Sequence, residues 1–138
     1  MKIVLDANIF VSALMRGGNP ATIIRWIVRK FDTLFTTDEI IDEVEDVISR
    51  PKFGLTEKEV KYKIQNINEM STRITVTERV TTGGCRDKTD NKYLECAIAA
   101  NADYIISGDI HLRELKEYRG VKIVNAAEYL EIVGGRLD

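Results

Sequence analysis

Two carboxylates follow short apolar runs that have the composition of buried strands. Asp6 ends the run 2–6, and Asp109 comes shortly after the run 102–107. The apolar residues of the first run are continuous rather than alternating, as in a strand that helices cover on both faces. Because parallel strands end at the same edge of a sheet, we expect Asp6 and Asp109 to be near neighbours. Either could instead merely cap the helix that follows it.

A third acid, Asp90, lies at the start of a predicted helix over 89–101. At 100° per residue it shares a face with Tyr93, Leu94 and Ala97, near the centre of the apolar arc. Its carboxylate is therefore predicted to point inward. Glu95 falls almost opposite and is predicted to be a solvated acid. The alternative for Asp90 is an ordinary first-turn acid that accepts backbone N–H groups.

The predicted helix over 38–49 carries acids on both borders of its apolar face. Glu43 lies on one border and Glu45 on the other, and the helical wheel does not choose between them. The apolar face itself consists of Ile40, Ile41, Val44, Val47 and Ile48. Four further acids lie away from this face and are predicted to be solvated, namely Asp38, Glu39, Asp42 and Asp46.

Several carboxylates brought to one rim repel one another and lose hydration, which raises their pKa values unless a cation compensates. Oxygen ligands suit Mg²⁺ or Mn²⁺. Zinc is not expected, because the only histidine is His111, which we place at the surface or on the substrate side. Cys85 and Cys96 do not form a CxxC pair, so we expect free thiols without a catalytic role.

Helical and strand patterns alternate along the chain. Strands are predicted at 2–6, 33–36, 73–77, 102–107 and 121–124. Helices are predicted from about 8 to 15, 20 to 30, 38 to 49, 56 to 70, 89 to 101 and 126 to 133. Such alternation produces βαβ units with right-handed crossovers. We therefore expect an α/β fold with a central five-stranded parallel sheet and helices on both faces.

The composition is that of one globular domain over 1–138, because 44% of its 138 residues are hydrophobic. No signal peptide or membrane span is evident, so we expect a cytoplasmic protein without a membrane partner. The formal net charge of −2 gives no support for nucleic-acid binding. Local basic residues do occur around the loops, at Arg16, Arg86, Lys88, Lys92 and Arg113.

Four motifs in this order resemble the PIN-domain family over nearly the whole chain. They are Asp6-Ala7-Asn8, Glu43, the segment 86–95 and Ser107-Gly108-Asp109. The sequence of residues 86–95 resembles that of the VapC-like branch of toxins in toxin–antitoxin pairs. The resemblance implies a Mg²⁺- or Mn²⁺-dependent ribonuclease acting on single-stranded RNA, often as a homodimer that an antitoxin protein inhibits.

The resemblance also assigns roles to individual residues. It implies a catalytic, metal-binding set, which consists of Asp6, Glu43, Asp90 and Asp109, and so favours Glu43 over Glu45. Small polar residues at Asn8 and Ser107 would bind the carboxylates on the substrate side, and Asp87 would be a fifth acid. Ala7 departs from the Thr of many members. Arg86 or Lys88 would hold a backbone phosphate while a metal ion activates the attacking water.

Three other functions compete with this hypothesis. A phosphatase with an aspartyl nucleophile would need an acid two residues after Asp6, where the chain has Asn8. A response-regulator receiver would need an acidic pair before the first strand and a lysine after the last, and both are missing. The remaining alternative is a catalytically inert PIN-like module that binds RNA or a protein, which the acidic net charge favours.

Overall fold

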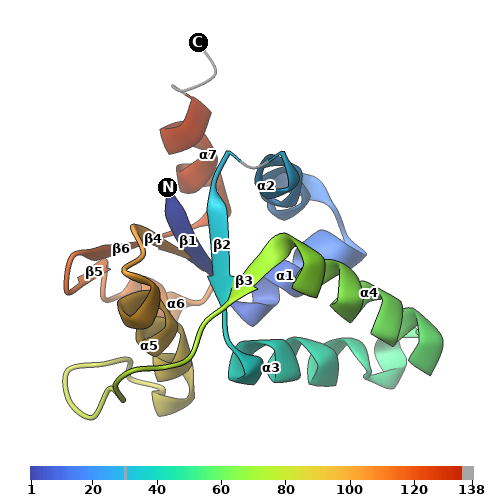
Figure 1. Ribbon diagram of the computed structural model, residues 1–138, viewed down its shortest axis with the longest axis horizontal. Helices are drawn as coiled ribbons and strands as arrows, with labels where there is room; N and C mark the ends of the chain where they lie inside the picture. Colours follow the sequence, from blue (N-terminus) through green and yellow to red (C-terminus); the bar gives the residue numbers. More distant parts are fainter. Residues whose placement is uncertain (30, 135–138) are drawn as a thin grey trace.

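A computed structural model describes residues 1–29 and 31–134 of the chain. In this part a single sheet has the strand order β3-β2-β1-β4-β6-β5. The strands are β1 (Lys2–Leu5), β2 (Thr33–Thr36), β3 (Ser71–Arg73), β4 (Tyr104–Ile106), β5 (Glu117–Tyr118) and β6 (Val121–Val124). The helices are α1 (Ala7–Met15), α2 (Gly18–Val28), α3 (Asp38–Ile48), α4 (Glu57–Met70), α5 (Asn91–Ala100), α6 (Ile110–Arg113) and α7 (Ala126–Gly134). Two short 3-10 turns complete them, η1 (Pro51–Phe53) and η2 (Lys88–Asp90) (Figure 1).

The predicted α/β fold is confirmed, but the sheet has six strands rather than five. Five of them are parallel, and β5 pairs antiparallel with β6. The two are joined by Arg119 and Gly120, whose φ angles of 49° and 84° are typical of a tight type I′ hairpin turn. A strand of two residues shows no periodicity, which is why the pattern did not indicate β5. The four-residue helix α6 was not predicted, because it is also too short to show periodicity.

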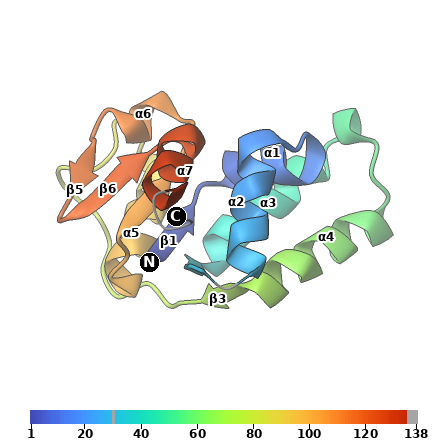
Figure 2. The same ribbon diagram turned by 90° about the horizontal axis from the view of Figure 1, so that it is seen from above.

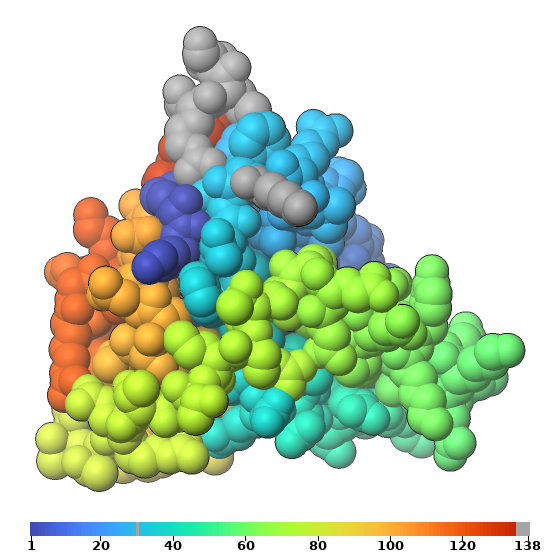
Figure 3. Space-filling view, in the orientation of Figure 1, coloured from blue at the N-terminus to red at the C-terminus, as the bar shows by residue number. Residues whose placement is uncertain are grey.

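The third strand is displaced from its predicted position at 73–77. It begins at Ser71, immediately after α4 ends at Met70, and pairs with β2 from Leu34 to Thr36. The alternating residues beyond Arg73 leave the sheet and run as an irregular segment with several bends over 74–87 along one side of the molecule (Figure 3). The predicted end of the second helix, Lys30, lies outside the described residues.

Helices cover both faces of the sheet, as predicted. The helix α5 packs on β1, β2 and β4. The helix α2 contacts both α1 and α7, and the three form the other layer (Figure 2). The middle strand β1 is therefore covered on both sides, and Ile3, Val4 and Leu5 are completely buried. The continuous apolar run of this strand reflects its central position.

One buried acid, Asp32, ties the chain start to this second layer. Its carboxylate accepts hydrogen bonds from the Met1 amino group and from Trp26 Nε1, both at 2.7 Å, and from the Tyr129 hydroxyl. Asp32 thereby joins β1, α2 and α7, far from the carboxyl ends of the strands. No helix within 1–29 and 31–134 has the length and apolar character needed to cross a membrane.

Candidate active site

Asp6 and Ser107 meet where the neighbouring strands β1 and β4 end. The parallel register pairs Leu5 with Ile106, and the Asp6 N–H donates to the Ile106 carbonyl at 3.1 Å. The Ser107 hydroxyl donates to Asp6 Oδ2, while Asp6 Oδ1 accepts the Ile9 N–H at 2.9 Å. Only 2% of Asp6 is exposed. This burial raises the pKa of Asp6 to about 6, although both hydrogen bonds act in the opposite direction.

Asp109 lies next to this pair, in the turn that leads from β4 into α6. Its N–H donates to Ser107 Oγ at 2.9 Å, and its Oδ1 accepts the His111 N–H at 2.7 Å. Like Asp6, Asp109 therefore does cap the helix that follows it, as the simpler interpretation required. The cap uses one oxygen of each carboxylate. Repulsion between Asp109 and Asp6 contributes to the raised pKa of Asp6.

Asp90 behaves differently, because its side chain forms no capping hydrogen bond with α5. Its Oδ2 is buried and has no hydrogen-bond partner in the described part of the chain. Burial, followed by repulsion from Asp109 and Asp87, raises the pKa of Asp90 to about 6. The alternative of an ordinary first-turn acid does not describe this side chain. An unpaired buried carboxylate oxygen is costly, and a cation would relieve that cost.

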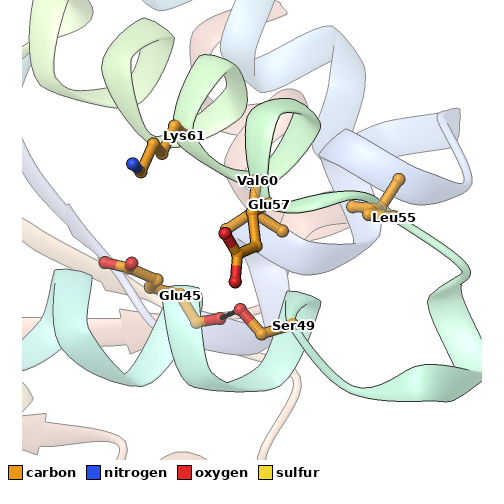
Figure 4. A pocket seen from close by; sticks show the side chains of 6 residues that line it. All are labelled: Glu45, Ser49, Leu55, Glu57, Val60 and Lys61. Carbon is orange, nitrogen blue, oxygen red and sulfur yellow. Dashed lines mark hydrogen bonds between the residues drawn. The ribbon is translucent and has the colours of Figure 1, made fainter.

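Glu43 and Glu45, which the helical wheel could not separate, point to different cavities. Glu43 lines the same cavity as Asp6, Asp90 and Asp109. Glu45 lines another cavity between α3 and α4, beside Ser49 and Lys61 (Figure 4). The structure thus brings Glu43, and not Glu45, to the acidic rim.

Two residues at the start of α5 hold Glu43 in place, and the sequence did not single out either of them for the site. Lys92 Nζ lies 3.1 Å from Glu43 Oε1, and the Tyr93 hydroxyl donates to Glu43 Oε2. The same hydroxyl accepts the Ala7 N–H at 3.1 Å. Burial and the bond to Glu43 raise the pKa of Tyr93, so the phenol stays protonated. For Tyr93 the available signal was its position three residues after Asp90, which places both on one helix face. Lys92, two residues after Asp90, had no such signal.

These side chains surround a cavity of about 250 Å³, which we call the acidic cavity. It is lined by Asp6, Ala7, Asn8, Glu43, Val47, Arg50, Asp87, Thr89, Asp90, Tyr93 and Asp109. Of the predicted substrate-side residues, Asn8 is therefore in contact with the cavity. Ser107 is fully buried beside Asp6, where it can orient the carboxylate but cannot reach a substrate.

The other predicted phosphate contacts lie outside the lining. Arg86 is exposed and paired with Glu114, and Lys88 is exposed on η2. Asp87 does reach the cavity, but its carboxylate accepts the N–H and hydroxyl of Thr89, which lowers its pKa. Neither Arg86 nor Lys88 therefore lines the acidic cavity.

The prediction that Glu95 is solvated was wrong. Only 5% of Glu95 is exposed, because the segment 74–87 folds over this face of α5. Glu95 Oε1 accepts from Arg79, and Oε2 accepts the Val80 N–H, both at 2.9 Å. The two thiols are free, as predicted, and burial raises the pKa of Cys85 to about 11 and that of Cys96 to about 12. Protonated thiols are poor nucleophiles.

The donor set of the acidic cavity suits a hard divalent cation, because it consists of carboxylate oxygens and includes the unpaired Oδ2 of Asp90. The arrangement is not a finished cage. Within 1–29 and 31–134, no three His, Cys, Asp or Glu side chains are positioned to hold one ion together. Both carboxylate oxygens of Glu43 are already bonded, one to Lys92 and one to Tyr93.

Comparison with known proteins identifies the family. The model of the PIN domain matches residues 2–111, which include all four acids and most of the chain. The chain belongs to the PIN-domain family. PIN domains are in general nucleases that use divalent metal ions, so membership supports a nuclease activity. An uncharacterized protein of Methanocaldococcus jannaschii is 28% identical over 148 residues, covering 95% of this chain and 90% of that protein.

Solved structures share the PIN fold at low sequence identity. VapBC2 from Rickettsia felis, bound to a DNA fragment from its promoter, has a TM-score of 0.63 at 16% identity, covering 91% of this chain and 98% of that one. VapBC-1 from nontypeable Haemophilus influenzae has a TM-score of 0.61 at 14% identity, covering 92% and 99%. The T. brucei RRP44 PIN domain has a TM-score of 0.52 at 11% identity, covering 98% and 83%.

Proposed function

We propose that this PIN domain is a ribonuclease that hydrolyses phosphodiester bonds of single-stranded RNA with Mg²⁺ or Mn²⁺. The observation that carries the proposal is the buried, unpaired Oδ2 of Asp90 in a cavity shared with Asp6 and Asp109. The buried carboxylate of Asp6 and the unpaired oxygen of Asp90 would be stabilised by a compensating positive charge. Family membership supports the nuclease activity, and the oxygen-only donor set supports the choice of metal.

Each residue of the rim has a distinct part in this proposal. Asp6 and Asp90 would be the principal ligands, and Asp109 and Glu43 would hold a second ion or orient the attacking water. Ser107 fixes the rotamer of Asp6, and Tyr93 does the same for Glu43. When bound, the ion would supply an activated water and would stabilise charge on the phosphorus oxygens. No side chain of the protein has to act as a nucleophile.

The direct test replaces Asp6 or Asp90 with asparagine. We expect Asp6→Asn and Asp90→Asn each to lower the Mn²⁺-dependent cleavage of a single-stranded RNA oligonucleotide by about a hundredfold or more, because each substitution removes an anionic ligand. Circular dichroism would verify that both variants fold. Asp42→Asn, an exposed acid of α3, is the matched control and should cleave normally. Normal cleavage by Asp6→Asn would overturn the proposal.

The biological role that we propose is the toxin of a toxin–antitoxin pair, held inactive in the cytoplasm by an antitoxin protein. The likeness of the fold to the two VapBC structures supports this role. Expression of the wild-type protein should then arrest bacterial growth, whereas expression of Asp90→Asn at the same level should not. Growth arrest by both proteins would contradict a nuclease toxin. We also propose a homodimer, for which sedimentation should give twice the mass of the chain.

The second candidate is an inert PIN-like module. It is favoured by the lack of three side chains that could hold an ion as they stand in the described residues. In such a module the carboxylates would bind no metal, and Mn²⁺ would leave the stability of the protein unchanged. Metal titration therefore separates the two candidates even before an RNA substrate is known.

A further inference from the structure

A second cavity continues from the acidic cavity along the molecule, and we call it the basic groove. It has a volume of about 280 Å³ and lies between α1 on one side and the end of α3 with η1 on the other. It is lined by Asn8, Val11, Ser12, Arg16, Val47, Arg50, Lys52 and Phe53. Three of these residues, Asn8, Val47 and Arg50, line the acidic cavity as well. The groove is therefore adjacent to the acidic cavity, and these three residues separate it from the carboxylates.

The charge of the groove contrasts with that of the chain. Arg16, Arg50 and Lys52 line it without any acidic residue, whereas the whole sequence has a formal net charge of −2. Arg16 and Lys52 are exposed and form no ion pair with a described residue. Among the described residues, Arg50 forms an ion pair only with Asp46, at 3.7 Å and at the surface, where such a contact contributes little. The three cations therefore remain available to an anionic ligand.

The other lining residues suit a nucleotide chain. Asn8 and Ser12 offer hydrogen-bonding groups from α1, and Phe53 offers a half-buried aromatic ring. Lys52 Nζ lies 5.1 Å from the centroid of that ring, so charge and aromatic surface are adjacent. Grooves that bind single-stranded nucleic acid combine these two features, because the cations follow the phosphates while aromatic rings contact bases.

We propose that the basic groove binds the RNA strand on one side of the scissile phosphate, with Arg16 and Lys52 contacting backbone phosphates and Arg50 standing between groove and acidic cavity. This inference rests on the proposed ribonuclease function and adds the path of the substrate to it. It also replaces the expected phosphate contact by Arg86, since that guanidinium is paired with Glu114 and does not line the acidic cavity. The acidic net charge of the chain then no longer opposes RNA binding, because binding depends on this local surface.

The test removes two charges from the groove and, as a control, two from elsewhere. The variant Arg16→Ala/Lys52→Ala leaves the acidic cavity intact. The control Arg119→Ala/Lys122→Ala loses the same two charge types from exposed positions at the amino end of β6. We expect the groove variant to raise the KM for a single-stranded RNA oligonucleotide by about tenfold and to change kcat by less than about twofold. The control should retain both constants.

Binding without cleavage separates this inference from the proposed function. In an Asp6→Asn background, fluorescence anisotropy should show that the groove substitutions weaken RNA binding by about tenfold. The slope of log Kd against log salt concentration should fall by the equivalent of about one phosphate contact or more. If the groove variant cleaves RNA with an unchanged KM, the groove proposal is overturned and the ribonuclease proposal stands. If the wild type binds RNA through the groove but does not cleave it, the groove proposal is supported and the ribonuclease proposal is overturned. Equal competition by polyglutamate would show a general polyanion site and overturn the inference.

Discussion

The acids of the cavity differ in how fully their oxygens are bonded. Both oxygens of Asp6 accept hydrogen bonds, Asp109 has one in its cap, and Asp90 Oδ2 accepts none from the described residues. Asp6 is therefore fixed in orientation before any ligand arrives, whereas Asp90 gains most from a cation. A site built in this way binds its ligand at the expense of the stability of the free protein.

Replacing Asp6 with asparagine should stabilise the metal-free protein near pH 7.5. The folded-state pKa of Asp6 is about 6, above its usual value of 3.8, so the folded state must keep a buried carboxylate ionised above pH 6. We expect a gain of about 1–3 kcal/mol in the free energy of unfolding, measured by urea denaturation with EDTA. The gain should decline below pH 6 and vanish below about pH 3, where Asp6 is protonated in both the folded and the unfolded state.

The matched control for this experiment is Asp42→Asn, because Asp42 is an exposed acid. Its stability should follow that of the wild type at every pH. A loss of stability in Asp6→Asn at pH 7.5 would show that the hydrogen bonds from Ile9 and Ser107 outweigh the cost of burial.

Lys92 should oppose metal binding, because it places a positive charge at the rim. Its ammonium group lowers the pKa of Asp90, although burial and nearby acids dominate and leave that pKa raised. The substitution Lys92→Met keeps the length of the side chain and removes the charge. Calorimetry should then show Mn²⁺ binding tighter on the order of fivefold, which corresponds to about 1 kcal/mol. Lys122→Met, an exposed lysine of β6, should leave the affinity unchanged, and weaker binding by Lys92→Met would contradict this interpretation.

Sequence patterns predicted the site residues with unequal success. The inward direction of Asp90 followed from its place on the apolar arc, and the proximity of Asp6 and Asp109 followed from parallel strands. Glu95 failed because a helical wheel assumes one solvent face, whereas a distant segment folds over this one. Lys92 was noted only as one of several local basic residues, because lysines are usually exposed and the pattern gave it no partner. Only tertiary contact with Glu43 shows its role.

At the scale of elements, the segment 74–87 positions the start of α5. The Cys85 N–H donates to Asn91 Oδ1 at 2.8 Å, directly after Asp90. Gly84 is needed here, because a Cβ would overlap Asn91 Oδ1 and would lie 2.6 Å from Val80 Cγ1. This contact connects a surface segment to a residue of the acidic cavity.

We therefore expect Gly84→Ala to lower the free energy of unfolding by about 2–3 kcal/mol, through overlap and the loss of the Cys85 hydrogen bond. Mn²⁺ affinity should fall as well, because the start of α5 moves. Chemical denaturation and calorimetry measure the two effects. Gly134→Ala is the control, since a Cβ there meets open space. If Gly84→Ala has the same free energy of unfolding as the wild type, the segment 74–87 accommodates the Cβ by shifting, and the prediction is wrong.

The elements that were predicted best are those with strong local signals. β2 and β6 have the predicted bounds, because both are short β-branched or apolar runs between turn residues. The helix α4 begins with the predicted capping box of Thr56 and Glu59. β3 was misplaced because Arg73 to Thr77 alternate without being buried, and pairing with β2 is decided by tertiary structure rather than by pattern.

At the scale of the whole molecule, metal binding should appear as stability. A ligand that binds only the folded state raises its free energy of unfolding, by about 2.7 kcal/mol at a hundred times its Kd. Thermal denaturation should therefore shift upward when Mn²⁺ is added to the wild type. The double variant Asp6→Asn/Asp90→Asn should not respond. A wild type that is equally indifferent would favour the inert module.

The two edges of the sheet bear on how this protein assembles. One edge is the two-residue β5, and the other is the three-residue β3, where Arg73 is held by Asp38 and Asn68. Strands this short offer few free backbone groups to a foreign strand. Growth of the sheet across two molecules is therefore disfavoured. A second copy of the chain or an inhibitor protein should therefore bind through side chains on helix faces. Strand-by-strand growth into fibres is not expected.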